Sequence, residues 1–231
     1  MIPLNVSWTT QDVSAILQGK PKDFPGLFTA ALWPSVDGSS FYSYNGGYWR
    51  TDPNTFYPEL QNRLWEFTPN SSGLGDWSPI TPPPDSNYTL LSKTTGSLQA
   101  SYNGLSFVLG GYVSVVPISG MVMFNESTQQ WWNLSSTGYS WQGEAVGGTA
   151  QFVPSFGPQG LLFVFGGSVN DVKVAFDYVF MFEPLSQQWR KQLTSGTPPS
   201  PVTLLWVVGV EGDDGTYEVS HKQMTQSTTT P

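Results

Sequence analysis

The sequence contains no cysteine and a single histidine, His221, among its 231 residues. The lack of cysteine excludes disulfides, thiolate metal sites and a cysteine nucleophile. Charged residues are also scarce, at 11%, against roughly a quarter in average globular proteins. The net charge is −8 and no basic cluster occurs, so we expect no nucleic-acid partner.

Long apolar runs are missing as well. No stretch approaches the roughly 18 residues that a membrane-spanning helix needs. Residues Met1 to Trp8 have neither the basic region nor the apolar region of a signal peptide. We therefore expect no membrane span and no targeting signal in this chain, and an extracellular or cell-surface location if a longer parent carries a signal segment.

What the sequence does contain is glycine, proline and aromatic side chains. There are 24 glycines and 19 prolines, and aromatic residues make up 15% of the chain. Helices avoid both glycine and proline in their interiors. The composition therefore indicates an all-β fold of many short strands joined by tight turns.

One pattern occurs three times along the chain. An apolar strand ends in a glycine pair, a second apolar strand ends near a phenylalanine, and a tryptophan follows a polar turn. The glycines are Gly46 with Gly47, Gly110 with Gly111, and Gly166 with Gly167; the aromatic residues are Phe67 with Trp77, Phe124 with Trp131, and Phe182 with Trp189. A spacing near 50 residues, with four strands in each repeat, is the signature of propeller blades.

The repeated residues have a structural explanation. A glycine pair lets the backbone leave the strand and lets the next blade approach closely. No helix start or Lys-Ser/Thr follows any pair, which argues against phosphate binding. The tryptophans are expected to fill the wedge between blades, with sugar stacking as the alternative. Trp131 and the adjacent Trp132 point to opposite faces, so one of them could be exposed.

The repeat resembles the kelch repeat over roughly Leu27 to Leu193. The stretches Phe156–Gly167 and Val208–Glu218 are most similar to secreted or membrane-anchored kelch proteins of filamentous fungi. Such proteins form closed rings of usually about six or seven blades. The resemblance thus implies a kelch-type β-propeller of about three complete four-stranded blades with partial blades at both ends, an incomplete ring that indicates a truncated form.

The expected organisation follows from the spacing of the repeats. It comprises a remnant of a preceding blade with its connection (1–26), a first blade (27–80), a second blade with connecting loops (81–147), a third blade (148–200), a partial fourth blade (201–219) and a disordered polar tail (220–231). Two open blade faces would remain, which predicts self-association.

Candidate catalytic residues are sparse. Kelch-type copper oxidases resemble this chain in fold, but they need paired histidines and a cysteine crosslinked to tyrosine, which are absent. The acidic candidates for a hydrolase are Glu66, Glu126, Glu144, Asp177 and Glu183. The acidic stretch Glu211–Gly215 is interpreted as a turn, with a weak cation site as the alternative.

Five Asn-x-Ser/Thr sequons are possible N-glycosylation sites: Asn5, Asn70, Asn87, Asn125 and Asn133. Chance in a chain rich in Ser and Thr is the competing explanation.

We expect a non-catalytic binding or scaffold module for a protein or glycan, with no cofactor and no metal, as part of a larger extracellular or cell-surface glycoprotein. The alternatives are a galactose-oxidase-like enzyme whose catalytic residues lie outside this chain, and a non-functional fragment. Binding is expected in loops where the repeat is silent, such as Thr51 to Asn62 and Ser168 to Asp177.

Overall fold

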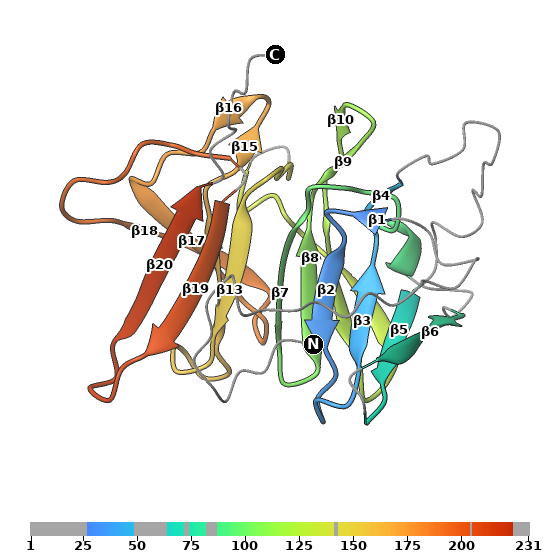
Figure 1. The fold of residues 1–231 in the computed structure, drawn as a ribbon. Helices are drawn as coiled ribbons and strands as arrows, with labels where there is room; N and C mark the ends of the chain where they lie inside the picture. Colours follow the sequence, from blue (N-terminus) through green and yellow to red (C-terminus); the bar gives the residue numbers. More distant parts are fainter. Residues whose placement is uncertain are drawn as a thin grey trace, which may run out of the picture.

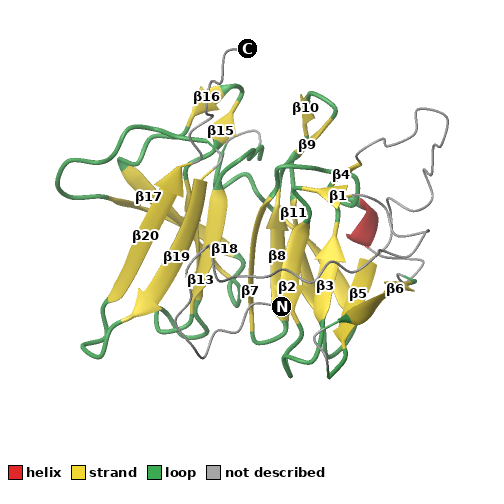
Figure 2. Ribbon diagram, in the orientation of Figure 1, coloured by secondary structure: helices red, strands yellow, loops and turns green. Residues whose placement is uncertain are grey.

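A computed structural model describes residues 27–48, 64–71, 74–81, 87–140, 143–203 and 205–223. The remnant at 1–26, the sequon at Asn5, the loop from Thr51 to Asn62 and the last eight residues of the expected tail lie outside this described part. Strands dominate it, and the short 3-10 helix η2 (Asn87–Thr89) is the only helical element of this described part (red in Figure 2). Among these residues, no helix is long and apolar enough to cross a bilayer.

Three four-stranded antiparallel sheets form the body of the molecule, as the repeat predicts, and they follow one another in chain order (Figure 1). Sheet 1 comprises β2 (Ala31–Pro34), β3 (Phe41–Tyr44), β5 (Leu64–Pro69) and β6 (Gly75–Ile80). Sheet 2 comprises β7 (Leu98–Tyr102), β8 (Leu105–Leu109), β11 (Met121–Asn125) and β12 (Gln130–Leu134). Sheet 3 comprises β13 (Thr149–Val153), β14 (Leu161–Phe165), β17 (Tyr178–Glu183) and β18 (Gln188–Leu193).

A two-stranded sheet, β19 (Leu205–Glu211) with β20 (Tyr217–Gln223), follows sheet 3. Its first strand contacts β13, just as β13 contacts β7 and β7 contacts β2. The first strands of successive sheets therefore lie side by side. Residues 220–223, which were expected in a disordered tail, pair with residues 205–208, because a polar sequence still satisfies its backbone in an antiparallel ladder.

The three sheets share one strand register, which is marked by aromatic pairs. Phe67 lies directly opposite Trp77, Phe124 opposite Trp131, and Phe182 opposite Trp189, and the ring centroids are 5.2, 4.7 and 5.3 Å apart respectively. Each pair thus joins the third and fourth strands of its sheet, where direct cross-strand neighbours stabilise pairing most.

Two apolar clusters fill the spaces between the sheets. Sheets 1 and 2 bury Trp33, Tyr44, Val122, Phe124 and Trp131 against one another. Side chains pointing the other way from sheet 2, including Phe107 and Met121, pack on Phe152, Leu162 and Phe182 of sheet 3. The expected packing role of Phe124, Trp131, Phe182 and Trp189 is therefore visible in these clusters.

The adjacent tryptophans of β12 serve both clusters. Trp131 is buried between sheets 1 and 2, and Trp132 is half-buried against the cluster between sheets 2 and 3. Because neighbouring residues of a strand point to opposite faces, the pair lets one strand contribute to two cores. Neither ring is exposed.

The glycine pairs follow the second strand of each sheet, but the first pair is shifted by one residue from its expected place. The aromatic register aligns Asn45 and Gly46 with Gly110 and Gly111, and with Gly166 and Gly167. Asn45 has φ 54°, close to the 63° of Gly110 and the 58° of Gly166. Asparagine is the residue that best replaces glycine in this left-handed conformation, so Gly47 is not part of the equivalent pair.

Short connecting strands complete the described part. They are β1 (Leu27–Phe28), β4 (Gly47–Tyr48), β9 (Tyr112–Val113), β10 (Val116–Pro117), β15 (Ser168–Val169) and β16 (Val172–Lys173). They lie together at one end of the sheets (Figure 1).

Candidate functional site

The second residue of each left-handed pair ties its sheet to the connection that enters the next one. The amide of Gly46 donates to the carbonyl of Thr94 at 2.7 Å, that of Gly111 to Ala145 at 2.6 Å, and that of Gly167 to Val202 at 3.0 Å. No side chain takes part, and the φ values of these glycines are 100°, 101° and 86°. These three glycine amides thus hold the backbone connections between successive sheets.

Two of these glycines also anchor short hairpins. The carbonyl of Gly111 accepts from Ile118 at 2.8 Å, which closes the hairpin β9–β10, and the carbonyl of Gly167 accepts from Val174 at 2.9 Å, which closes β15–β16. In addition, Ser168 exchanges two backbone hydrogen bonds with Val146. Each hairpin therefore rises from a rigid base.

The hairpin tips are two-residue turns. Ser114 has φ 59° at the tip of β9–β10, and Asn170 and Asp171 have φ 49° and 60° at the tip of β15–β16. Positive φ at both central residues makes the β15–β16 tip a type I′ turn, whose twist matches that of the flanking strands, whereas in β9–β10 only the first central residue has positive φ. The loop Ser168 to Asp177, where function was expected, is therefore in its first half an ordered hairpin.

Three valine side chains on these hairpins are exposed to solvent. Val115 is 89% exposed, Val172 69% and Val116 59%. A groove of about 260 Å³ lies between the two hairpins. Its lining residues are Tyr112, Ser114, Val115, Pro117, Val146, Ser168, Asn170 and Asp171. We call the exposed valines and this groove the hairpin surface.

The sequence singled out only the half of this surface that lies in the loop Ser168 to Asp177. It did not single out the β9–β10 half, because isolated valines are common in any strand-rich chain. A signal was present in Asn170-Asp171, which favours positive φ between two apolar residues.

A second feature was also missed: Thr29, Gly96 and Gly147 share φ values of 51°, 65° and 65° just before the first strands of the three sheets.

Two acidic candidates come to the same region between sheets 1 and 2. Glu66 accepts a hydrogen bond from the hydroxyl of Ser40 at 2.8 Å, and Glu126 accepts from the amide of Val36 at 2.9 Å. Burial, and then the charges of Glu66 and Glu126, raise the pKa of Tyr42 to about 12. Glu126 thereby joins the β2–β3 turn to sheet 2, which gives it a structural task.

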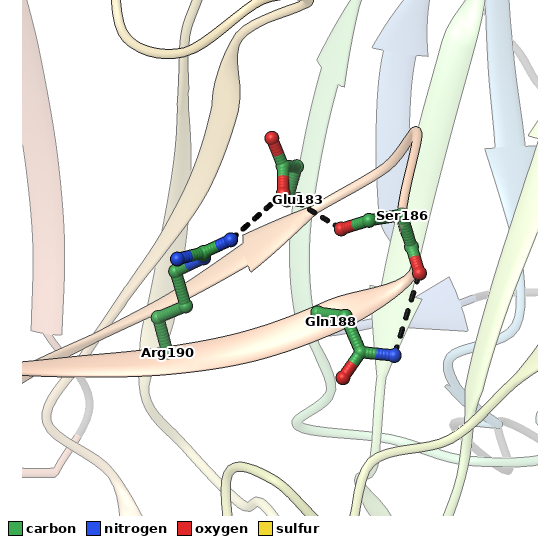
Figure 3. A network of polar contacts seen from close by, with 4 residues as sticks. All are labelled: Glu183, Ser186, Gln188 and Arg190. Atoms are coloured by element: carbon green, nitrogen blue, oxygen red, sulfur yellow. Dashed lines mark hydrogen bonds and ion pairs between the residues drawn. The ribbon is translucent and has the colours of Figure 1, made fainter.

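Glu183 belongs to a polar network in the turn between β17 and β18 (Figure 3). Its carboxylate accepts from the hydroxyl of Ser186 at 2.6 Å and lies 3.4 Å from the guanidinium of Arg190. The amide of the Gln188 side chain donates to the carbonyl of Ser186 at 3.4 Å. These contacts bind the turn to itself.

The remaining acids are dispersed. Asp177 is exposed and its backbone carbonyl accepts from Thr194 at 2.9 Å, whereas one carboxylate oxygen of Glu144 is buried without a hydrogen-bond partner among the described residues. Within this part of the chain, no group of three or more His, Asp and Glu side chains could hold a metal ion.

The acidic stretch Glu211–Gly215 forms the turn between β19 and β20, as expected. Asp214 accepts from the amide of Thr216 at 3.0 Å and from its hydroxyl at 2.6 Å, and these bonds lower the pKa of Asp214. The carboxylate therefore caps its own turn. Both Asp213 and Asp214 are exposed.

The four described sequons lie in and around sheets 1 and 2. Asn70, Asn87 and Asn133 are exposed, and Asn125 is half-buried. The side-chain amide of Asn87 donates to the carbonyl of Trp131 at 3.1 Å, and the side-chain oxygen of Asn125 accepts from Ser127 and Thr128. Asn70 lies in the turn between β5 and β6, and Asn133 lies on β12.

No model of a known protein family matches the chain, and no curated protein matches it as a relative.

Proposed function

We propose that this chain is a non-catalytic binding module, built as part of a kelch-type β-propeller, and that its hairpin surface binds a protein partner. The observation that carries the proposal is the position of Val115, Val116 and Val172. Their side chains are 89%, 59% and 69% exposed on two adjacent hairpins, although burying them elsewhere would have been favourable.

The support of the hairpins fits a binding role. Each hairpin starts at a glycine whose amide and carbonyl are both engaged, so the tips are held in place before a partner arrives. Pre-organised loops on a rigid scaffold lose little conformational entropy on binding. Each hairpin base is also held by one isolated bridge of two backbone hydrogen bonds, Tyr112 with Thr95 and Ser168 with Val146.

The chemistry of the surface favours a protein over a glycan. Sugar rings are usually recognised by flat aromatic faces, and Tyr112 is the single aromatic residue of the groove and is half-buried. Protruding valines instead match the apolar centre of a protein interface, with Asn170 and Asp171 as a polar rim. An extracellular or cell-surface setting is part of this proposal, supported by the exposed sequons at Asn70 and Asn133.

The test compares three versions of the chain as bait for surface and secreted proteins of the source organism. The versions are the natural chain, the double variant Val115→Ser with Val172→Ser, and the control Leu185→Ser, whose side chain is exposed in the turn between β17 and β18. A captured protein is then purified and titrated against all three. We expect the double variant to bind at least about tenfold more weakly, since central apolar contacts dominate interface energy.

Equal affinity of the double variant and the control would contradict the proposal. Binding to a glycan array that survives the double substitution would assign the function to another surface and to sugars instead.

A further inference from the structure

The face of sheet 3 that points away from sheet 2 carries a second, larger groove of about 550 Å³. The apolar residues Phe163, Phe165, Val179 and Met181 line it, together with Tyr217 and Val219 of β20. We call this region the sheet 3 groove. It lies on a different part of the molecule from the hairpin surface and shares no lining residue with the groove there.

The same face of the two preceding sheets is filled. The strand register aligns Tyr42 of sheet 1 and Phe107 of sheet 2 with Phe163 of sheet 3. Phe124 of the next sheet meets Tyr42 edge-on, with centroids 5.9 Å apart and planes at 67°. Phe182 meets Phe107 in the same way, at 6.4 Å and 66°.

Each of these covering phenylalanines is half of a cross-strand pair. Phe124 is paired with Trp131, and Phe182 with Trp189, in the hairpin formed by the third and fourth strands of the covering sheet. The same packing arrangement therefore occurs twice in the fold. A β-hairpin with a Phe–Trp pair closes the apolar face of the sheet before it.

At sheet 3 the covering sheet has two described strands, β19 and β20, which correspond to the first two strands of a complete sheet. Tyr217 is fixed against sheet 3 by a hydrogen bond from Gln151 at 3.2 Å. The described residues include no strand along the second edge of β20. Accordingly, Phe107 is 1% exposed whereas its equivalent Phe163 is half-buried.

We propose that the sheet 3 groove, with the edge of β20, is an acceptor site for a β-hairpin of another polypeptide that carries a cross-strand Phe–Trp pair. The incoming first strand pairs antiparallel with β20 by main-chain hydrogen bonds. Its phenylalanine lies edge-on against Phe163, as Phe182 lies against Phe107. Addition of strands to an open sheet edge gives affinity through the backbone and specificity through the side-chain seats.

The residues at the outer margin of the groove indicate which side chain of the bound hairpin is its main anchor. Arg190 and Gln192 of β18 stand where sheet 2 has Trp132 and Leu134. The sheet 3 groove is thus apolar beneath the inner strand of the bound hairpin and polar beneath its outer strand. Phenylalanine is therefore the main anchor, and the tryptophan packs beside Gln192 at the rim.

The chain itself supplies a probe. A synthetic peptide of residues 120–135, which spans β11 and β12, contains both Phe124 and Trp131. A fluorophore on this peptide reports binding to the full chain by anisotropy. We expect saturable one-to-one binding, and slower hydrogen exchange at amides of β20 when the peptide is bound.

Two controls sharpen the result. A peptide with Phe124→Ser and Trp131→Ser should bind at least about tenfold more weakly. In the full chain, Leu193→Asp places a charge in the groove, whereas Leu185→Asp places one on the same hairpin outside it; these leucines are 66% and 61% exposed. Only Leu193→Asp should weaken binding, and both variants should keep the circular dichroism spectrum of the natural chain.

Several outcomes would overturn the proposal. The absence of saturable binding, equal binding of the two peptides, or unchanged exchange at β20 each excludes a hairpin acceptor. If the Leu193→Asp chain loses structure, the peptide comparison and the exchange experiment still decide. A dimer of the chain that the peptide cannot dissociate, and that Leu193→Asp abolishes, would assign the groove to a second copy instead.

Discussion

The buried hydroxyl of Tyr139 donates a hydrogen bond to the backbone carbonyl of Gly166 across 3.0 Å. Tyr139 follows the last strand of sheet 2, and Gly166 is the first glycine of the pair in sheet 3. The ring packs on Phe180 and Trp189 of sheet 3, with centroids 5.1 and 6.0 Å away. One side chain thus joins the end of one sheet to the left-handed bend of the next.

Replacing Tyr139 with phenylalanine tests this link. The ring would stay in place, but the carbonyl of Gly166 would lose its buried partner, so the free energy of unfolding should fall by about 1–2 kcal/mol. Urea denaturation measures the change. Tyr102→Phe is the control, because Tyr102 is 46% exposed and should cost little. Equal losses in the two variants would show that the buried bond carries no special weight.

Alkaline pH should destabilise the fold through its buried tyrosines. Burial raises the pKa of Tyr44 and of Tyr139 above the ordinary value of 10.0, and burial with the charges of Glu66 and Glu126 raises that of Tyr42 to about 12. Above pH 10 the unfolded chain releases these protons and the folded chain retains them. Stability is therefore level below about pH 10 and falls as the pH rises further.

Urea midpoints between pH 8 and 12 measure this dependence. The variant Tyr139→Phe removes one of the raised groups, so its decline should be shallower than that of the natural chain. A midpoint that stays constant from pH 10 to 12, or an unchanged slope in the variant, would contradict the assignment.

Gly110→Ala should be far more damaging than Gly38→Ala. Both glycines have positive φ, 63° and 69°, which costs an alanine about 1–2 kcal/mol. At Gly38 the added methyl group meets nothing within 4 Å, whereas at Gly110 it overlaps the backbone carbonyl of Ala145. A further loss of about 1–3 kcal/mol is expected at Gly110. Thermal or urea unfolding of the two variants gives the difference, and similar losses would refute the close approach.

Phe182 and Phe163 offer a matched pair in the core and in the sheet 3 groove. Phe182 is fully buried between sheets 2 and 3, so Phe182→Ala should cost about 3–5 kcal/mol. Phe163 is half-buried on the open face, and Phe163→Ala should cost about half as much or less. An equal cost, measured by denaturation, would mean that the groove is closed in solution.

Much of the fold was predictable because the repeated residues each perform one geometric task. The repeated phenylalanine and tryptophan correctly placed the third and fourth strands of the three sheets, and the structure shows that these residues form cross-strand pairs. The glycine pairs at 110 and 166 were recognisable because few other residues tolerate two successive positive φ values. These are local constraints, and the sequence records them locally.

The misassigned features depend on tertiary context. Asn45 takes the place of a glycine because its side chain accepts from Ala31 at 2.9 Å and donates to Thr94 at 3.1 Å, contacts that no spacing rule shows. The end of β20 reaches Gln223 because β19 offers a backbone ladder, not because its residues are apolar. The β9–β10 half of the hairpin surface was missed for a related reason: it meets the remote β15–β16 hairpin only after the sheets have packed.

The orientation of the Phe–Trp pairs gives the array a polarity. In sheets 2 and 3 the pair faces the preceding sheet, while the opposite face offers a seat such as Phe107 to the sheet that follows. Such a sheet packs its Phe–Trp pair on the preceding sheet, and its opposite face receives the pair of the following sheet. A duplicated copy of residues 96–147 inserted after sheet 2 would therefore pack on sheet 2 with its Phe–Trp pair and would receive the pair of sheet 3 on its opposite face. The chain could thus lengthen or shorten by whole repeats without redesign of either neighbour.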